Sequence, residues 1–444
     1  MPGPKKKLYI RTFGCQMNVA DSERMAQVLA DDFVLTDKAE EADIYLINTC
    51  AIRRKSEEKV RSLLGSLKGL KQRRPQLILG VGGCVAQQEG DRLLGAAPHL
   101  DLVFGAHGIY RLPQLVSRAA AGERPVDVEL SRCFPEAPRR RWESPPARTF
   151  VTIMQGCNNF CSFCVVPYVR GREYSREPSD IIGEIGEFLA AGGQEVTLLG
   201  QNVNSYGRGL MEPVTFPELL RRVAALPGLR RLRFATSHPR DLSPDLIAAY
   251  GELPALCEHL HLPVQSGSNR ILQAMNRGYT REEYLDKAAR LRQTRPDLAL
   301  STDLIVGFPG ETEADFEQTL DLMRQAGFDQ AFSFKYSPRP QTQAAAFSGQ
   351  VPDEIKAERL SRLQTFQDDL TLKAHRRLVG KVREALVEGG SKRSPVELCG
   401  RLRTNQVVNF QGPQDLVGRL LMVEITEAHP HSLKGRRAVG PPLS

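Results

Sequence analysis

The sequence contains no long hydrophobic run. No stretch of about 18 uncharged apolar residues occurs among the 444 residues, so we expect no membrane-spanning helix and no membrane partner. The first residues, MPGPKKKLYIRTFGC, are basic but are not followed by the apolar segment of a secretory signal peptide. These two absences favour a cytoplasmic protein.

A disulfide framework is missing as well. The nine cysteines are an odd number, and the chain is long enough to form two or three domains that each bury a core. Six of the cysteines occur in settings typical of metal ligands, which favours a reducing compartment. The other three, Cys133, Cys257 and Cys399, have no such setting, and we expect none of them to be a ligand.

Acidic residues are scarce toward the C-terminus. The whole chain has 60 basic and 52 acidic residues, a net charge of +8. From His375 to the end there are 12 Lys and Arg but 6 Asp and Glu, so about three quarters of the positive excess lies there. A basic segment of this kind favours a polyanionic partner such as a nucleic acid, although a solvated basic surface is the alternative.

Residues 5–122 alternate short apolar runs with helical patterns. This alternation predicts an α/β domain with a parallel sheet. Cys15, Cys50 and Cys84 each follow one of the apolar runs, LYIRTFGC, IYLINTC and LILGVGGC. Because ligands collect at the carboxyl ends of parallel strands, we expect the three thiols to meet at one rim of the sheet. Three buried structural cysteines are the alternative.

The rest of the chain divides into three further segments. Residues 123–148 are rich in Pro and Arg, contain the single tryptophan, and are predicted to be a linker. Residues 149–374 contain six candidate strands with helical stretches between them, which predicts a partial (β/α)6 barrel with its site at the carboxyl ends of the strands. Residues 375–440 follow a long charged helix and are predicted to form a small antiparallel β-barrel.

The loop after the first barrel strand carries three closely spaced cysteines. Cys157, Cys161 and Cys164 form a C-x3-C-x2-C pattern within GCNNFCSFCVVPYVRG. Three thiolates can hold a [4Fe-4S] cluster and leave one iron open, whereas a structural zinc site needs a fourth ligand. The two groups of three cysteines therefore predict two [4Fe-4S] clusters, one that activates a small molecule and one that holds a sulfur species.

The C-x3-C-x2-C spacing and the β–α repeats behind it resemble the radical S-adenosylmethionine superfamily. The resemblance implies that the open iron binds S-adenosylmethionine. It also implies that further residues contact this cofactor, and the matching positions are Phe163, Gly192, Gly193, Glu195, Gln265, Ser266 and Gly307. The alternative for each glycine is a turn that requires a positive φ.

Motifs along the whole chain are similar to those of the methylthiotransferase family: TFGCQMNVADSE, NTCAIRRKSEEKV, GGCVAQQEG, LLGQNVNSYG, HLPVQSGSNRILQAMNRGYTREEY and STDLIVGFPGET. This resemblance implies an N-terminal cluster domain, a radical S-adenosylmethionine domain and a C-terminal RNA-binding TRAM domain. It also implies the addition of a methylthio group to C2 of N6-isopentenyladenosine at position 37 of tRNA. Sister enzymes act on threonylcarbamoyl-adenosine of tRNA or on an aspartate of a ribosomal protein, and these substrates remain alternatives.

The resemblance further implies how the parts would work. One S-adenosylmethionine supplies a methyl group and another supplies a radical, with electrons from a donor such as flavodoxin or ferredoxin. No catalytic residue beyond the cluster ligands is expected, and the protein is expected to be a monomer. The TRAM domain and the linker arginines Arg139, Arg140 and Arg141 would contact tRNA phosphates in the anticodon loop. A non-catalytic, redox-sensing iron–sulfur RNA-binding protein is the alternative from another class.

Overall fold

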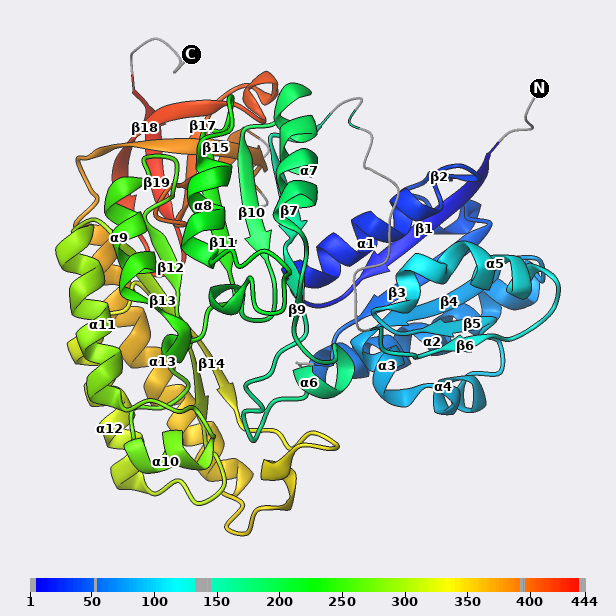
Figure 1. Ribbon diagram of the computed structural model, residues 1–444, viewed down its shortest axis with the longest axis horizontal. Helices are drawn as coiled ribbons and strands as arrows, with labels where there is room; N and C mark the ends of the chain where they lie inside the picture. Colours follow the sequence, from blue (N-terminus) through cyan, green and yellow to red (C-terminus); the bar gives the residue numbers. More distant parts are fainter. Residues whose placement is uncertain are drawn as a thin grey trace.

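The computed structural model describes residues 5–51, 54–131, 142, 145–391, 394 and 396–438, which form three packed parts (Figure 1). Cys133 and the three linker arginines lie outside the described residues. No helix within the described ranges is long and apolar enough to cross a membrane.

The first part is a six-stranded parallel sheet with helices on both faces, as predicted. The strands lie in the order β2-β1-β3-β4-β5-β6. Their bounds are Lys6–Thr12 (β1), Phe33–Leu35 (β2), Ile44–Thr49 (β3), Ile78–Gly83 (β4), Leu102–Phe104 (β5) and Val126–Asp127 (β6). The helices are Gln16–Val28 (α1), Arg54–Arg73 (α2), Cys84–Glu89 (α3), Asp91–Ala96 (α4) and Leu112–Ala120 (α5). β3 is buried along its whole length because apolar clusters cover it from both sides.

The second part has six parallel strands in two sets of three, which confirms the predicted partial barrel. The orders are β11-β10-β7 and β12-β13-β14, and a single bridge between Leu232 and Leu256 joins the two sets. The strands are Arg148–Thr152 (β7), Glu195–Leu199 (β10), Arg231–Ala235 (β11), His259–His261 (β12), Ala299–Val306 (β13) and Gln330–Lys335 (β14). The helices around them are Val166–Val169 (α6), Pro178–Ala190 (α7), Phe216–Ala224 (α8), Pro244–Glu252 (α9), Asn269–Ala274 (α10), Arg281–Thr294 (α11), Glu313–Ala326 (α12) and Asp353–Arg376 (α13).

The third part is a closed five-stranded barrel in the order β15-β16-β17-β19-β18. Its strands are Val382–Gly390 (β15), Glu397–Leu402 (β16), Val407–Gln411 (β17), Leu420–Ala428 (β18) and Leu433–Arg437 (β19). The prediction of an antiparallel barrel is right for four of the five pairings, but β17 and β19 are parallel. That pairing closes the barrel, and no local pattern in the sequence specifies it.

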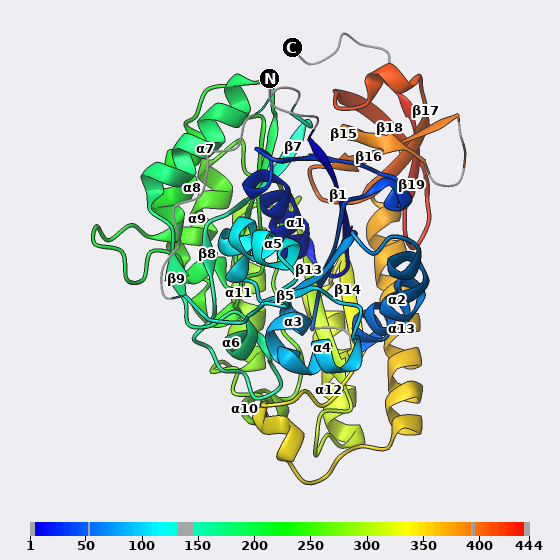
Figure 2. The same ribbon diagram turned by 90° about the vertical axis from the view of Figure 1, so that its right-hand side faces the viewer.

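The three parts meet at opposite ends of the central strands. α13 runs the length of the central part and leads into the C-terminal barrel (Figure 2). That barrel covers the amino ends of the central strands, while the N-terminal sheet lies beside β7 and α6 (Figure 1). The carboxyl ends of the central strands and the rim of the N-terminal sheet therefore belong to one interface, and the C-terminal barrel belongs to another.

Buried arginines attach the C-terminal barrel to the central part. Arg231, with no exposed surface, donates to the Glu384 carboxylate at 2.8 Å. Arg233 donates to the carbonyl oxygen of Leu402 at 2.8 Å. The Glu195 carboxylate lies between the two guanidinium groups, 3.3 Å from each. Because these groups are desolvated and both arginines donate hydrogen bonds across the contact, the barrel is held in one orientation.

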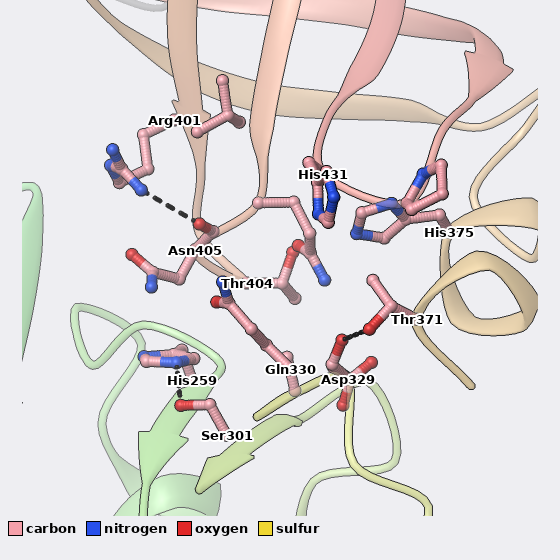
Figure 3. A pocket seen from close by; sticks show the side chains of 14 residues that line it. His259, Ser301, Asp329, Gln330, Thr371, His375, Arg401, Thr404, Asn405 and His431 are labelled. Carbon is pink, nitrogen blue, oxygen red and sulfur yellow. Dashed lines mark hydrogen bonds between the residues drawn. The ribbon is translucent and has the colours of Figure 1, made fainter. Parts of the chain in front are cut away.

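A polar cavity of about 80 Å³ lies at the same interface (Figure 3). His259 and Asp329 line it from the central strands, His375 from α13 and His431 from the C-terminal barrel. Burial lowers the pKa of both His259 and His375 and raises the pKa of Asp329. Burial thus disfavours the charged form of all three groups.

Candidate functional site

The C-x3-C-x2-C loop begins just beyond the carboxyl end of β7. Two short paired strands, Met154–Gln155 (β8) and Tyr174–Ser175 (β9), close the base of the segment. Gly156 has φ 77°, and a Cβ there would overlap the carbonyl oxygen of Arg172. Within the loop, the Cys164 amide donates to the Cys161 carbonyl at 2.9 Å. The glycine and this turn bring the backbone back on itself and place three cysteines around one point.

The three thiols of this loop lie in a water-poor setting. Burial raises the pKa of Cys157 to about 11 and that of Cys164 to about 12, and the neighbouring Cys161 adds to both shifts. Arg277 donates from Nη1 to the Cys161 sulfur at 3.3 Å. His238 lies with Nε2 4.0 Å from the same sulfur. A bound metal cation would replace the protons of these buried thiols, and Arg277 would stabilise the thiolate of Cys161.

The second group of cysteines meets at one rim of the N-terminal sheet. Cys15 follows β1, Cys50 follows β3 directly and Cys84 is the first residue of α3 after β4. β1, β3 and β4 are neighbours and parallel, so their carboxyl ends lie together. A hydrogen bond with Cys50 and the charge of Arg170 lower the pKa of Cys15 to about 6. This arrangement agrees with the expectation that the three thiols converge.

Close backbone packing and buried amides hold this rim. Gly14 has φ 124°, and a Cβ there would overlap the Cβ of Cys50. Asn18 donates to the carbonyl of Thr49 at 2.9 Å, and Asn48 donates to the carbonyl of Asn18 at 2.8 Å. The Cys15 sulfur, when it carries its proton, donates to Asn18 Oδ1 at 3.3 Å. The sequence reasoning did not select these asparagines, although amides inside apolar runs are a usable signal.

Both cysteine groups provide three thiols and no obvious fourth protein ligand. Among the residues that the structure describes, no three His, Cys, Asp or Glu side chains are arranged to hold a single metal ion. Three thiols that face one space are the donor set of a [4Fe-4S] cluster with one iron left for another ligand. The residues present therefore fit two such clusters.

A short stretch of chain connects the two groups. α6 follows Cys164 directly, and Val165 and Val169 pack with Cys84 and Val85 in one buried cluster. Arg170, at the end of α6, donates from Nε to the Cys84 sulfur at 3.4 Å. The cysteine loop and the rim of the N-terminal sheet therefore meet at α6.

Four of the residues expected to contact the cofactor lie at the carboxyl ends of the central strands. Phe163, which lies within the cysteine loop, packs beside Phe308 and Met275. Gln265 follows β12 with φ 75°, and Ser266 beside it is fully buried. Gly307 follows β13 with φ 70°, and its amide donates to Glu311 at 2.8 Å. These positions lie at the same end of the central strands as the cysteine loop.

Gly192, Gly193 and Glu195 lie at the other end of the barrel, which corrects the expectation for these three. β10 runs parallel to β7 with Glu195 beside Arg148, whereas the cysteine loop follows the opposite end of β7. Glu195 belongs to the arginine network that holds the C-terminal barrel. The carboxyl end of β10 instead leads to Gln201, whose Oε1 accepts from the Gly156 amide at 2.6 Å.

The structure adds three polar residues that the sequence reasoning missed. Asn202 lies shortly after β10, Ser237 after β11 and Tyr336 directly after β14. Each is buried and has one side-chain oxygen without a hydrogen-bond partner among the described residues. Buried polar atoms of this kind are rarely left unsatisfied, so they indicate a polar ligand at the carboxyl ends of the strands.

Three family models match the chain. Residues 7–105 match the "Uncharacterized protein family UPF0004", residues 151–323 match the "Radical SAM superfamily" and residues 376–437 match the "TRAM domain". The cysteine groups at the rim and in the loop fall within the first and second matches, respectively. The third match covers the five-stranded barrel.

Two solved structures share the fold over most of this chain. The radical S-adenosylmethionine methyltransferase TsrM from Kitasatospora setae, with cobalamin and a [4Fe-4S] cluster bound, has a TM-score of 0.56 at 13% identity and covers 77% of this chain and 74% of its own. The cobalamin-dependent radical enzyme OxsB has a TM-score of 0.51 at 13% identity, and the match covers 82% of this chain and 56% of the OxsB chain. At this identity the similarity establishes the fold alone.

Relatives with the full set of domains are much more similar. The tRNA-2-methylthio-N6-dimethylallyladenosine synthase of Geobacter metallireducens is 52% identical over 98% of this chain and 99% of its own. The enzymes of the same name from Syntrophobacter fumaroxidans and Moorella thermoacetica are 51% and 50% identical, each over 98% of this chain, and over 96% and 99% of their own. The chain belongs to the family of tRNA-2-methylthio-N6-dimethylallyladenosine synthases, which are radical S-adenosylmethionine methylthiotransferases.

Proposed function

We propose that this protein adds a methylthio group to C2 of N6-isopentenyladenosine at position 37 of tRNA. The observation that carries the proposal is the pair of three-thiol groups that face each other across α6, one in a radical S-adenosylmethionine loop and one on the rim of the first sheet. C2 of adenine bears an unactivated C–H bond, and no side-chain base is strong enough to remove its proton. A radical abstracts its hydrogen atom instead, and the neighbouring group supplies the sulfur.

Each group of cysteines holds one [4Fe-4S] cluster in this proposal. Cys157, Cys161 and Cys164 hold the cluster that binds S-adenosylmethionine, and Cys15, Cys50 and Cys84 hold the second. The clusters, when bound, supply an electron for the cleavage of S-adenosylmethionine at one site and an iron that carries sulfur at the other. One S-adenosylmethionine gives its methyl group to the sulfur, and another gives the radical.

The residues at the strand ends orient S-adenosylmethionine. Phe163 borders the adenine position, and Gln265, Ser266 and Gly307 stay assigned to the cofactor because they lie beside the loop. The unsatisfied oxygens of Asn202, Ser237 and Tyr336 offer acceptors and hydroxyl donors to its amino, carboxylate and ribose groups. We withdraw Gly192, Gly193 and Glu195 from this set because they lie at the amino end of β10.

Partners and boundaries follow from the same proposal. The TRAM domain binds tRNA near the anticodon loop, and a flavodoxin or ferredoxin supplies electrons to a monomeric, cytoplasmic enzyme. The domains extend over residues 5–122, 149–374 and 375–440, with residues 123–148 as the linker. The buried arginine contacts support treating the last domain as a fixed part of the enzyme rather than a tethered one.

Separate replacement of the two cysteine groups tests the proposal. Cys157→Ala, Cys161→Ala and Cys164→Ala should each abolish the formation of 5′-deoxyadenosine from S-adenosylmethionine under dithionite. Cys15→Ala, Cys50→Ala and Cys84→Ala should retain that reaction but fail to modify tRNA, as measured by mass spectrometry of its nucleosides. Reconstituted wild-type protein should contain about eight irons per chain. A plateau near four would contradict the two-cluster proposal.

The same variants distinguish the alternative functions. A redox-sensing RNA-binding protein would not release 5′-deoxyadenosine in any variant. A methylthiotransferase with another substrate would release it but leave N6-isopentenyladenosine unmodified while altering threonylcarbamoyl-adenosine or a ribosomal-protein aspartate. Nucleoside and peptide mass spectrometry of a strain that lacks the gene identifies which of these substrates loses its methylthio group.

A further inference from the structure

We propose that Arg170 is a positioning residue for the sulfur ligand at the second cysteine group: its guanidinium donates to Cys84 and to an anionic sulfur species bound beside the three thiols. The proposal rests on the proposed function, since it requires a cluster at Cys15, Cys50 and Cys84. It assigns to a residue of the central domain a role at a site in the N-terminal domain.

The position of Arg170 is fixed from several sides. Its side chain is 3% exposed, and its guanidinium forms an ion pair with Asp21 of α1. The backbone carbonyl of Arg170 accepts from His107 Nε2 at 3.2 Å, and His107 Nδ1 in turn accepts from the Ser131 amide at 2.8 Å. A long side chain held this way loses little further freedom when a ligand binds.

One nitrogen of this buried guanidinium has no hydrogen-bond partner among the described residues. Nε donates to the Cys84 sulfur at 3.4 Å and Nη2 to Asp21, while Nη1 is buried and has no hydrogen-bond partner among the described residues. A buried N–H of a charged group that lacks an acceptor costs stability, so native structures retain it chiefly where a ligand satisfies it.

Arg277 beside the other cysteine group shows the contrasting case. Its Nη1 donates to the Cys161 sulfur at 3.3 Å, its Nη2 to the carbonyl of Pro263 at 2.6 Å and its Nε to the Tyr279 hydroxyl at 3.0 Å. Each of its three nitrogens has a protein partner, which suits an arginine that only supports a cluster. Arg170 makes a similar contact to a sulfur, but its Nη1 has no hydrogen-bond partner among the described residues.

The ion pair defines how the ligand is recognised. Asp21 largely cancels the charge of Arg170 as felt by a ligand farther away. The attraction to an anion therefore comes mainly from the hydrogen bond that the Arg170 N–H donates to it. A hydrogen bond to a cluster sulfur stabilises the reduced, more negative form of the cluster, which raises the reduction potential. The ligand class that fits is a small thiolate or hydrosulfide.

The test uses the full-length chain with Cys157→Ala, Cys161→Ala and Cys164→Ala as background, so that only the second cluster remains. Methanethiolate is titrated against this protein, and its binding and the midpoint potential of the cluster are followed by electron paramagnetic resonance. Arg170→Met should weaken methanethiolate binding about tenfold or more and make the potential more negative, with about four irons retained. Arg170→Lys should recover part of both losses.

Two further variants complete the design. Asp21→Asn keeps the guanidinium but removes the opposing charge, so it should tighten methanethiolate binding, the reverse of Arg170→Met. Arg24→Gln is the matched control, because Arg24 also lies on α1 and pairs across the domain contact with Glu184, at 3.7 Å, rather than with a cysteine. It should change neither the binding nor the potential.

The outcomes separate this inference from the proposed function. Unchanged binding and potential in Arg170→Met with its irons retained would overturn the role of Arg170 while leaving the cluster in place. If Arg170→Met loses its cluster, Asp21→Asn becomes the test, and unchanged methanethiolate binding in that variant overturns the inference. A background protein without any iron would remove the cluster site itself, and with it both proposals.

Discussion

Cys15 and Cys164 differ in the acidity of their thiols. The hydrogen bond with Cys50 and the charge of Arg170 lower its pKa to about 6, whereas burial raises that of Cys164 to about 12. In the metal-free protein at pH 7, iodoacetamide should therefore modify Cys15 well before Cys164, because the thiolate is the nucleophile. Peptide mass spectrometry at successive times gives both rates.

The pH dependence of this modification has a definite form. The rate at Cys15 should rise around pH 6 and level off near pH 7, where the thiolate is already the main form. An ordinary thiol continues to gain reactivity up to a pH near 8.5. A rate at Cys15 that keeps rising to that pH would contradict the structure.

Cys257 and Cys399 should be dispensable for metal binding. Cys257 is buried just before β12, at the end of the barrel away from both cysteine groups, and Cys399 lies on β16 of the TRAM barrel. The double variant Cys257→Ala, Cys399→Ala should keep about eight irons per chain by colorimetric analysis. A loss of about four irons would show that one cluster has a ligand outside the proposed sets.

The cysteines could be selected from sequence because their positions obey local rules: close spacing in one group and a strand end before each member of the other. Glu195 was assigned wrongly because four letters that match a family stretch do not tell which end of the strand they occupy. Asn202, Ser237 and Tyr336 were missed because an unsatisfied oxygen is defined only by its neighbours in space. The contact of Arg170 with Cys84 joins residues 86 positions apart, and no periodicity reports it.

At the scale of elements, the starts of β10 and β11 anchor the TRAM barrel. Arg231→Leu should weaken this contact by about 3–5 kcal/mol, because it leaves Glu195 and Glu384 in a desolvated interface with fewer partners. Amide hydrogen exchange in β15 and β16 should accelerate as the barrel detaches.

The matched control is Arg383→Ala at the edge of the same interface. Arg383 pairs with Asp297 at 3.5 Å, where Asp297 is 69% exposed in its side chain. An exposed pair of this kind contributes under about 1 kcal/mol, so exchange in β15 and β16 should stay near the wild-type rate. Equal acceleration in both variants would mean that the buried arginines do not hold the barrel.

Element types were the most predictable part of the fold. The six central strands could be read from apolar runs between helical patterns. The helices that bury these strands are recognisable because their apolar residues recur with the helical period of 3.6 residues. The division of these strands into two sets of three could not be read, since the pairing of one strand with the next depends on residues far apart in the sequence. The parallel pairing of β17 with β19 was hidden for a similar reason, because it joins strands that are not consecutive.

At the scale of the whole molecule, the TRAM interface should weaken in acid. Burial lowers the pKa of His259 and His375 below the ordinary value near 6.5, so the detached state binds protons that the docked state excludes. Docking is therefore at full strength above pH 6.5 and declines as the pH falls below it. Burial raises the pKa of Asp329, so the docked state takes up this proton more readily than the detached state, and its protonation in acid favours docking.

Hydrogen exchange at pH 7 and pH 5.5, corrected for the intrinsic rate, tests this dependence. Protection of β15 and β16 should fall at pH 5.5 in the wild type. His375→Gln can still hydrogen-bond but does not titrate, so it should show a smaller loss. Equal protection at both pH values in the wild type would contradict a role for these histidines at the interface.

Binding of tRNA should depend on charges on the exposed side of the TRAM barrel. Removal of the whole domain would uncover the buried arginine network, so surface variants are the sharper experiment. Lys381→Gln, Arg419→Gln and Arg437→Gln together neutralise three exposed groups. The combined variant should bind tRNA more weakly, with a salt slope smaller by about 0.7 to 0.9 for each phosphate that the protein no longer neutralises. Unchanged affinity and slope would move tRNA recognition to the central domain.

The stretch from Cys164 to Arg170 fixes the position of one cysteine group relative to the other. Only residues 165–169 separate a ligand of one group from the contact to the other. One inserted residue in α6 would turn Arg170 by about 100° about the helix axis while leaving every cysteine in its own segment. S-adenosylmethionine would then be consumed without any sulfur reaching RNA. Over evolutionary time this segment should accept substitutions but not insertions or deletions. A relative with a changed length here should cleave S-adenosylmethionine without transferring sulfur.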